Sequence, residues 1–203
     1  MRLTASLVLA ASVLALGACQ PAANGSEGSD SAAATPPAES SPSADTLTAE
    51  GWGPLRIGMT LDEVVAAAGP DSDPEAIGGP EPEYCDQFRP EQAPEGLLVM
   101  IEQGVLTSIS IFEPSTLRTD RGFGIGSTAA EIKAAYGDAA TVEPHHYVGP
   151  PAEYITAWNG GRPSEPYVQD PNARGISYET DENGVVTLIK VGGPSIQYVE
   201  GCA

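Results

Sequence analysis

Basic residues are scarce in this chain of 203 residues. It has 9 lysines and arginines against 28 aspartates and glutamates, a formal net charge of −19 at pH 7. A field of that sign repels nucleic-acid phosphates and anionic lipid headgroups. The composition therefore excludes a nucleic-acid partner. It leaves open whether the charge serves solubility alone or attracts a basic protein.

Histidine and cysteine are also scarce, with 2 and 3 copies. The two histidines, His145 and His146, are adjacent and follow Glu143. Adjacent side chains seldom point at one metal ion, and no His-x-x-x-His spacing is present. We therefore predict no metal centre and no cofactor, and we expect both histidines to be exposed in a loop.

Catalytic motifs are missing too. There is no Gly-x-Ser-x-Gly sequence, and the glycine loop 122–127 lacks the last glycine of a dinucleotide-binding motif. The acidic segments 71–75 and 181–184 are too short for a calcium loop. The sequence predicts no catalytic residue, although paired carboxylates of a hydrolase could come from anywhere among the acids.

Long hydrophobic runs are absent except at the start of the chain. Residues 3–18 form an apolar run of 16 residues behind Arg2. A membrane-spanning helix needs about 20 such residues. The length and the basic flank are typical of a secretory signal peptide, which we place at residues 1–18.

The end of this run, Leu16-Gly17-Ala18-Cys19, resembles a bacterial lipobox. The resemblance implies cleavage before Cys19 and its lipidation with palmitate-type chains, which anchor stably once two or more are present. Gln20 rather than aspartate follows the cysteine, which implies an outer-membrane lipoprotein facing the periplasm if the host is Gram-negative. An ordinary cleaved signal is the alternative.

The next segment, residues 19–48, is rich in alanine, serine and proline. It has too few large apolar residues to offset chain entropy by burial. We expect the lipidated cysteine to be followed by a disordered tether. Residues 49–203 then form one domain.

An internal repeat divides that domain. Residues 56–69 and 124–137 share seven of 14 positions. In both copies a threonine, Thr60 or Thr128, precedes a glutamate by three residues, which predicts a capping box at the start of a short helix. Each copy ends in glycine, a common residue just beyond a helix.

Three predicted strands follow each helix, with period-2 patterns and glycine turns. They are 83–89, 97–102 and 105–112 in the first half, and 154–158, 176–180 and 185–191 in the second. We therefore predict an α+β domain made by tandem duplication, with repeats at about 52–113 and 120–203. Its short helices should pack on one face of antiparallel sheet. Whether the repeats share one sheet stays open.

The pattern from Ile57 to Gly69 resembles the tandem module of β-lactamase-inhibitory proteins. It is also similar to the smallest lipoprotein of the outer-membrane β-barrel assembly machinery. Both families place such a helix before antiparallel strands and bind other proteins without catalysis. The second copy departs from the pattern at Ser127 and Lys133. Because the match lies in the scaffold, it implies a fold and transfers no partner-binding residue.

Cys85 and Cys202 remain if Cys19 is lipidated. An even pair in an oxidising compartment predicts a disulfide. Two separate thiols are the alternative, and a catalytic thiol would need a positioned histidine.

Four aromatic residues form a cluster in the insertion of the second repeat: Tyr147, Tyr154, Trp158 and Tyr167. Aromatic side chains on loop-rich polar segments are typical of protein contacts, and equally of strands that fill a small core. The leading hypothesis is an anchored, non-catalytic protein-binding module acting in assembly or inhibition. The alternatives are a small-ligand or ion-binding envelope protein with an apolar pocket between the repeats, or an acidic-residue hydrolase.

Overall fold

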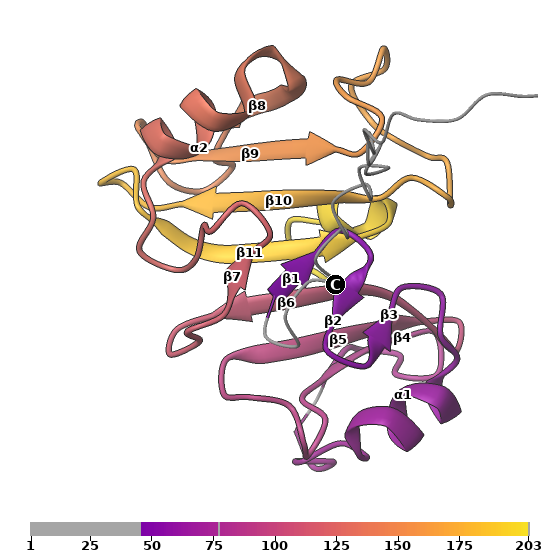
Figure 1. Ribbon diagram of the computed structural model, residues 1–203. Coiled ribbons are helices and arrows are strands. Elements are labelled where there is room, and N and C mark those ends of the chain that lie inside the picture. Colours follow the sequence, from indigo (N-terminus) through magenta and orange to yellow (C-terminus); the bar gives the residue numbers. More distant parts are fainter. Residues whose placement is uncertain (1–45, 77, 203) are drawn as a thin grey trace, which may run out of the picture. The chain divides into compact units, whose positions relative to one another are not determined.

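The computed structural model describes residues 46–76 and 78–202 (Figure 1). The predicted signal peptide, the predicted lipidation site Cys19 and most of the predicted tether lie outside these residues. Within the described residues, no helix combines the length and the apolar character needed to cross a membrane.

A seven-stranded antiparallel sheet, in the order β4-β5-β6-β11-β10-β9-β8, dominates the domain. Its strands are β4 (Cys85–Phe88), β5 (Leu97–Glu102), β6 (Val105–Phe112), β8 (Ala140–Pro144), β9 (Glu153–Trp158), β10 (Gly175–Thr180) and β11 (Val186–Gly192). The mixed α+β class is confirmed, with strands outweighing helices. All six predicted strands form, with ends within two residues of those expected. Edge strand β8 was not predicted.

One sheet spans both halves of the domain because β6 pairs with β11. The two strands are antiparallel, with Ser108 opposite Gly192 and Phe112 opposite Leu188. The question that the sequence left open is therefore answered in favour of one continuous sheet.

The helices α1 (Leu61–Ala68) and α2 (Ala129–Tyr136) begin as the sequence predicts. The Glu63 N–H donates to Thr60 Oγ1 at 3.3 Å, and the Thr60 N–H donates to Glu63 Oε2 at 2.8 Å. Thr128 and Glu131 make the same reciprocal pair at 3.3 and 2.9 Å. These capping boxes satisfy N–H groups that have no partner within the helix.

A second, four-stranded sheet has the order β3-β2-β1-β7. Its strands are β1 (Thr46–Thr48), β2 (Gly51–Trp52), β3 (Leu55–Arg56) and β7 (Arg118–Thr119). Strand β1 lies in the segment predicted to be a disordered tether, and Leu47 is 0 % exposed. The predicted boundary at residue 49 is therefore wrong by at least three residues. Burial of Leu47 and pairing of β1 with β7 provide the contacts that composition alone did not reveal.

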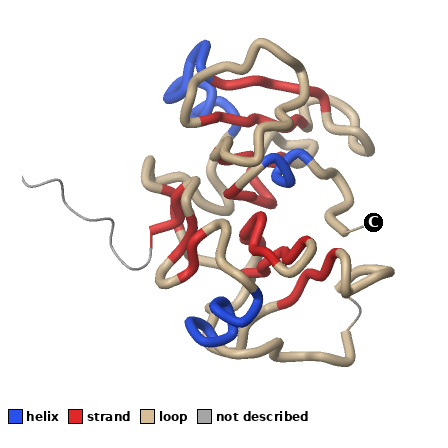
Figure 2. The backbone as a smooth tube through the Cα atoms, turned by 90° about the vertical axis from the view of Figure 1, so that its right-hand side faces the viewer, coloured by secondary structure: helices blue, strands red, loops and turns tan. Residues whose placement is uncertain are grey.

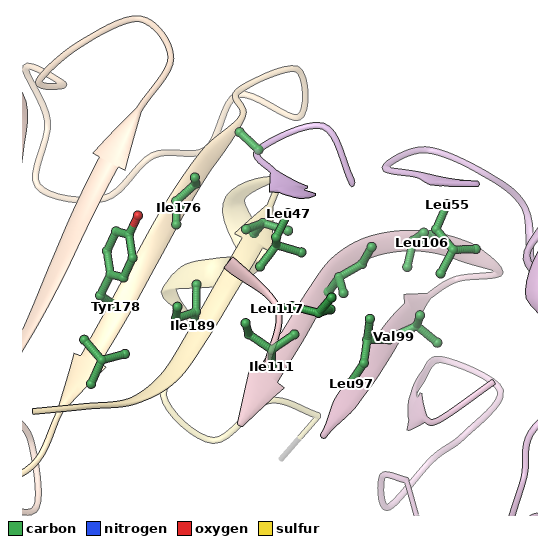
Figure 3. Close-up of a cluster of buried hydrophobic side chains, with 14 of the residues drawn as sticks. Leu47, Leu55, Leu97, Val99, Leu106, Ile111, Leu117, Ile176, Tyr178 and Ile189 are labelled. Atoms are coloured by element: carbon green, nitrogen blue, oxygen red, sulfur yellow. The ribbon is translucent and has the colours of Figure 1, made fainter. Parts of the chain in front are cut away.

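The hydrophobic core lies on one face of the large sheet (Figure 3). Leu97, Ile111, Ile189, Tyr178 and Ile155 stand side by side across five strands and are all fully buried. Both helices contribute to the same cluster. Figure 2 shows α1, α2 and the small sheet on this side, with the 3-10 turn η2 (Pro194–Gln197) and the C-terminal segment on the other.

The predicted disulfide between Cys85 and Cys202 is present. It joins β4, at one end of the large sheet, to the end of the chain across a separation of 117 residues. Cross-linking a loop of that length removes unfolded-state entropy worth about 5 kcal/mol at most.

Replacing either capping threonine, as Thr60→Ala or Thr128→Ala, should lower the free energy of unfolding by about 1 kcal/mol. Urea denaturation measures this. Ser115→Ala serves as a loop comparison, because Ser115 is half-buried outside the helices and its hydroxyl accepts the Leu117 N–H. Equal stability of all variants would contradict a role for the caps.

The capping glutamates should make part of the stability depend on pH. Hydrogen bonds from the Thr60 N–H and hydroxyl lower the pKa of Glu63, and those from Thr128 lower the pKa of Glu131. A carboxyl whose pKa is lower in the folded chain stabilises it above the unfolded pKa, and this contribution is lost as pH falls through the folded pKa. The destabilisation caused by Glu63→Gln or Glu131→Gln at pH 7 should therefore shrink below about pH 4. Denaturation at both pH values tests this.

Breaking the disulfide with the Cys85→Ser and Cys202→Ser pair should lower the free energy of unfolding by up to about 5 kcal/mol. Reducing agent should destabilise the native chain and leave the double variant unchanged. An unchanged melting temperature in both experiments would contradict the cross-link.

Candidate binding site

The face of the large sheet opposite the core presents polar side chains in register. Thr156 on β9, Ser177 on β10, Lys190 on β11 and Ser110 on β6 are successive cross-strand partners. Ser110 and Ser177 are buried, and the Thr156 hydroxyl donates to Ser177 Oγ at 3.1 Å. Burying such groups costs free energy unless they find partners. A ligand that binds over this polar row could therefore provide hydrogen-bond partners for its side chains.

A second row of charged and aromatic residues runs beside the first. Glu143 on β8 pairs with Tyr154 on β9, which pairs in turn with Glu179 on β10. Because directly paired residues share one face of a sheet, both carboxylates flank the tyrosine on the face of Lys190.

The residues of the two rows on β8 to β11 form the floor of a cavity of about 320 Å³, whereas Ser110 on β6 lies outside it. Its walls come from the loops on either side of β9, from η2 and from the C-terminal segment. They include His146, Pro166, Tyr167, Ile196, Gln197, Tyr198 and Val199. The volume is at the small end of the range for ligand pockets, about 300–1,000 Å³. All lining residues fall between 143 and 199, so the cavity lies in the second half of the domain and not between the two predicted repeats, where a ligand pocket was expected.

Lys190 is the cation on this floor. Its Nζ donates to the backbone oxygen of Tyr198 in the C-terminal segment. Burial lowers the pKa of the ammonium, and the charge of Glu179 acts in the opposite direction. A lysine with few water contacts and one protein acceptor has unused hydrogen-bonding capacity.

His145 holds the loop before β9 against the sheet. Its side chain is only 7 % exposed, so the expectation that both histidines are exposed is wrong for His145, while His146 is exposed as predicted. The Nδ1 atom accepts the N–H groups of Tyr147 and Val148 at 3.1 Å each. The proton of the ring must therefore lie on Nε2, which donates to Glu179 Oε1 at 3.0 Å.

The aromatic residues that the sequence singled out are only partly brought together. Tyr154 and Tyr167 line the cavity. Tyr147 lies against the His145 ring, with centroids 6.4 Å apart, and its hydroxyl donates to Glu200. Trp158 lines a separate hollow, together with Arg174 among others. Two of the four residues therefore line one site, Tyr147 contacts the neighbouring loop and C-terminal segment, and the tryptophan belongs to a different hollow.

These aromatic side chains also differ in exposure. Tyr147 and Tyr167 are 69 % and 46 % exposed, whereas Tyr154 and Trp158 are half-buried. The Trp158 ring covers Gly175, where an added Cβ would lie 2.7 Å from Cε3. Of the two readings of the cluster, contact surface or core filling, the first suits Tyr147 and Tyr167 and the second suits Trp158.

The sequence analysis missed Ser177, Glu179 and Lys190. A signal was present, because polar residues alternate with Ile176 and Tyr178 in β10 and with Ile189 in β11. Alternation shows that a strand has a polar face, but that face is normally solvated. Only the covering by η2 and the C-terminal segment turns it into a cavity floor.

Removing the His145 ring should release the loop that it anchors. We expect His145→Ala to lower the free energy of unfolding by about 1 kcal/mol, because the exposed Tyr147 N–H, the partly buried Val148 N–H and Glu179 lose their partner. Amide exchange at Tyr147 and Val148 should accelerate. The adjacent exposed residue gives the matched control, His146→Ala, and equal effects of the two variants would contradict the anchoring role.

Comparisons with known proteins identify no relative from which a function could be inferred. No family model, no curated protein and no solved structure matches this chain. Among the described residues, no group of three or more histidine, cysteine or acidic side chains is arranged to hold a metal ion. Function must therefore be argued from geometry and chemistry, because a fold alone does not imply one.

Proposed function

We propose that this chain is a non-catalytic protein-binding module of the cell envelope, anchored through a lipid on Cys19 and acting in assembly or inhibition. The observation that carries the proposal is the exposure of Tyr147 and Tyr167 beside the cavity on an acidic domain. Exposed tyrosines supply large contact area at low entropic cost, and they are enriched at binding hot spots.

The proposal includes a tandem duplication that builds a broad sheet from two small units. Ser110 and Lys190 each stand six residues beyond the turn glycines Gly104 and Gly184. These two equivalent residues pair with one another across β6 and β11. Equivalent positions meet in this way only around a local two-fold axis, which supports a duplication.

The backbone bonds at the two helix starts support the same reading. The Leu61 N–H donates to the Gly104 oxygen at 2.9 Å, and the Ala129 N–H donates to the Gly184 oxygen at 2.9 Å. In both halves the start of the helix is thus bonded to the turn of the hairpin that follows it. The remaining difference is β8, an extra strand in the second half.

The chemistry of the surface favours a basic partner. Tyr147 contacts Glu200, and Glu143 lies exposed at the cavity. With a formal charge of −19 the whole chain attracts positively charged surfaces and accelerates their encounter. Asp86, whose pKa is raised by burial, does not line the cavity. The hydrolase alternative therefore gains no support there.

Cross-linking in intact cells, followed by affinity capture and mass spectrometry, tests the proposal. We expect one abundant co-purifying protein, and at least about tenfold less of it with the Tyr147→Ala and Tyr167→Ala double variant. Leu61→Ala is the matched control, because Leu61 is an apolar side chain, 40 % exposed, on α1. Equal capture by both variants would remove the assignment of this surface, and an empty capture would remove the protein-binding function.

Trp158→Ala separates contact from packing. Because the ring covers Gly175, we expect this variant to lower the melting temperature. The tyrosine double variant should leave it nearly unchanged. A Trp158→Ala variant that melts like the native chain and loses the partner would return Trp158 to the contact surface.

A further inference from the structure

The floor of the cavity holds donors that the protein does not use. A lysine ammonium has three N–H groups, and Lys190 gives one to Tyr198. Ser177 stands directly opposite Lys190, and its oxygen already accepts the Thr156 hydroxyl. The Ser177 proton is therefore available to an acceptor. Together these groups form a place for one carboxylate.

The neighbouring part of the cavity holds carboxylate acceptors. Glu179 accepts from the His145 ring through Oε1. Glu143 lines the cavity two strands away and is exposed. The hydroxyl of Tyr154, between them, is buried without a hydrogen bond of normal geometry among the described residues. Burial first, and then the charge of Glu179, raise the pKa of this phenol, while the His146 backbone acts in the opposite direction. The hydroxyl therefore keeps its proton and can donate.

Lys190 and Glu179 are neighbours on the sheet but do not form an ion pair with one another. Lys190 faces Ser177, whereas Glu179 faces Leu188, so the two charges are diagonal across β10 and β11. The backbones of two diagonally placed residues on adjacent strands are about 7–8 Å apart. Of the ion pairs within the described part of the chain, none joins Lys190 to Glu179.

We propose that this cavity binds a small zwitterion of the amino-acid type. Its carboxylate meets Lys190 and Ser177, and its ammonium lies toward Glu179 and Glu143. The rings of Tyr154 and Tyr167 contact its side chain. This site does not depend on the protein partner proposed above.

The charges favour a zwitterion over a simple ion. A lone anion would pair with Lys190 but face two carboxylates and the negative field of the chain. A lone cation would face the Lys190 ammonium on the floor. A ligand with both charges pairs its carboxylate with the lysine and its ammonium with the glutamates. Buried charges are stable when they are paired in this way.

Calorimetric titration of the full chain with three probes tests the proposal: phenylalanine, phenylalaninamide and 3-phenylpropanoate. The second probe lacks the carboxylate and the third lacks the ammonium. We expect phenylalanine to bind at least about tenfold more tightly than either, the equivalent of one lost charged contact. Binding of either single-charge probe as tight as that of phenylalanine, or no binding of phenylalanine, would overturn the proposal.

Two variants locate the charges. Lys190→Met should weaken phenylalanine binding at least about tenfold and should not weaken phenylalaninamide binding, because the cationic probe loses only a like charge. Glu179→Gln should weaken phenylalanine binding and should not weaken binding of the anionic 3-phenylpropanoate. The control is Lys133→Met, which removes the other lysine of the chain, paired with Glu153 outside the cavity. Loss of binding in the control, or unchanged binding of phenylalanine in both variants, would overturn the assignment.

Discussion

The pairing of β6 with β11 is the interaction on which the rest of the structure depends. It joins two short helix-and-hairpin units into one seven-stranded sheet. Neither two-turn helix would be stable alone. Their apolar residues Val64 and Ile132 are fully buried because the joined sheet provides one continuous apolar face. The core of this small domain therefore depends on the joint between its halves.

The same joint creates the second face of the sheet. Because side chains alternate along a strand, each core residue of β10 and β11 places its neighbour on the opposite side. There the register lines up Thr156, Ser177 and Lys190. An open antiparallel sheet would leave such a row in water. Here η2 and the C-terminal segment lie on that side of the sheet (Figure 2), and the row becomes part of the floor of a cavity.

The disulfide and the cavity are linked through the end of the chain. Cys202 is bonded to Cys85 on β4, and four residues earlier Tyr198 accepts a hydrogen bond from Lys190. The cross-link thus fixes the segment that supplies one wall of the site. A restraint that stabilises the fold also shapes the pocket, because among the described residues no strand follows β11 to hold the last residues in place.

The sequence by itself determined the local features of the described chain. Thr60, Glu63, Thr128 and Glu131 specify capped helices through contacts three residues apart, and strand patterns with turn glycines specify the hairpins. Such signals are readable because the interacting residues are close in sequence. The Cys85–Cys202 bond was predictable because few other partners exist for either cysteine.

Only the tertiary structure decided the rest. Strand β1 and the two-residue strands of the small sheet are too short to show a period, and burial of Leu47 depends on residues far along the chain. His145 is buried because Glu179 reaches it from another strand. The cavity unites residues from 143 to 199 that no local pattern connects. Long-range register and covering segments place these groups together, and neither is encoded in the spacing of neighbouring residues.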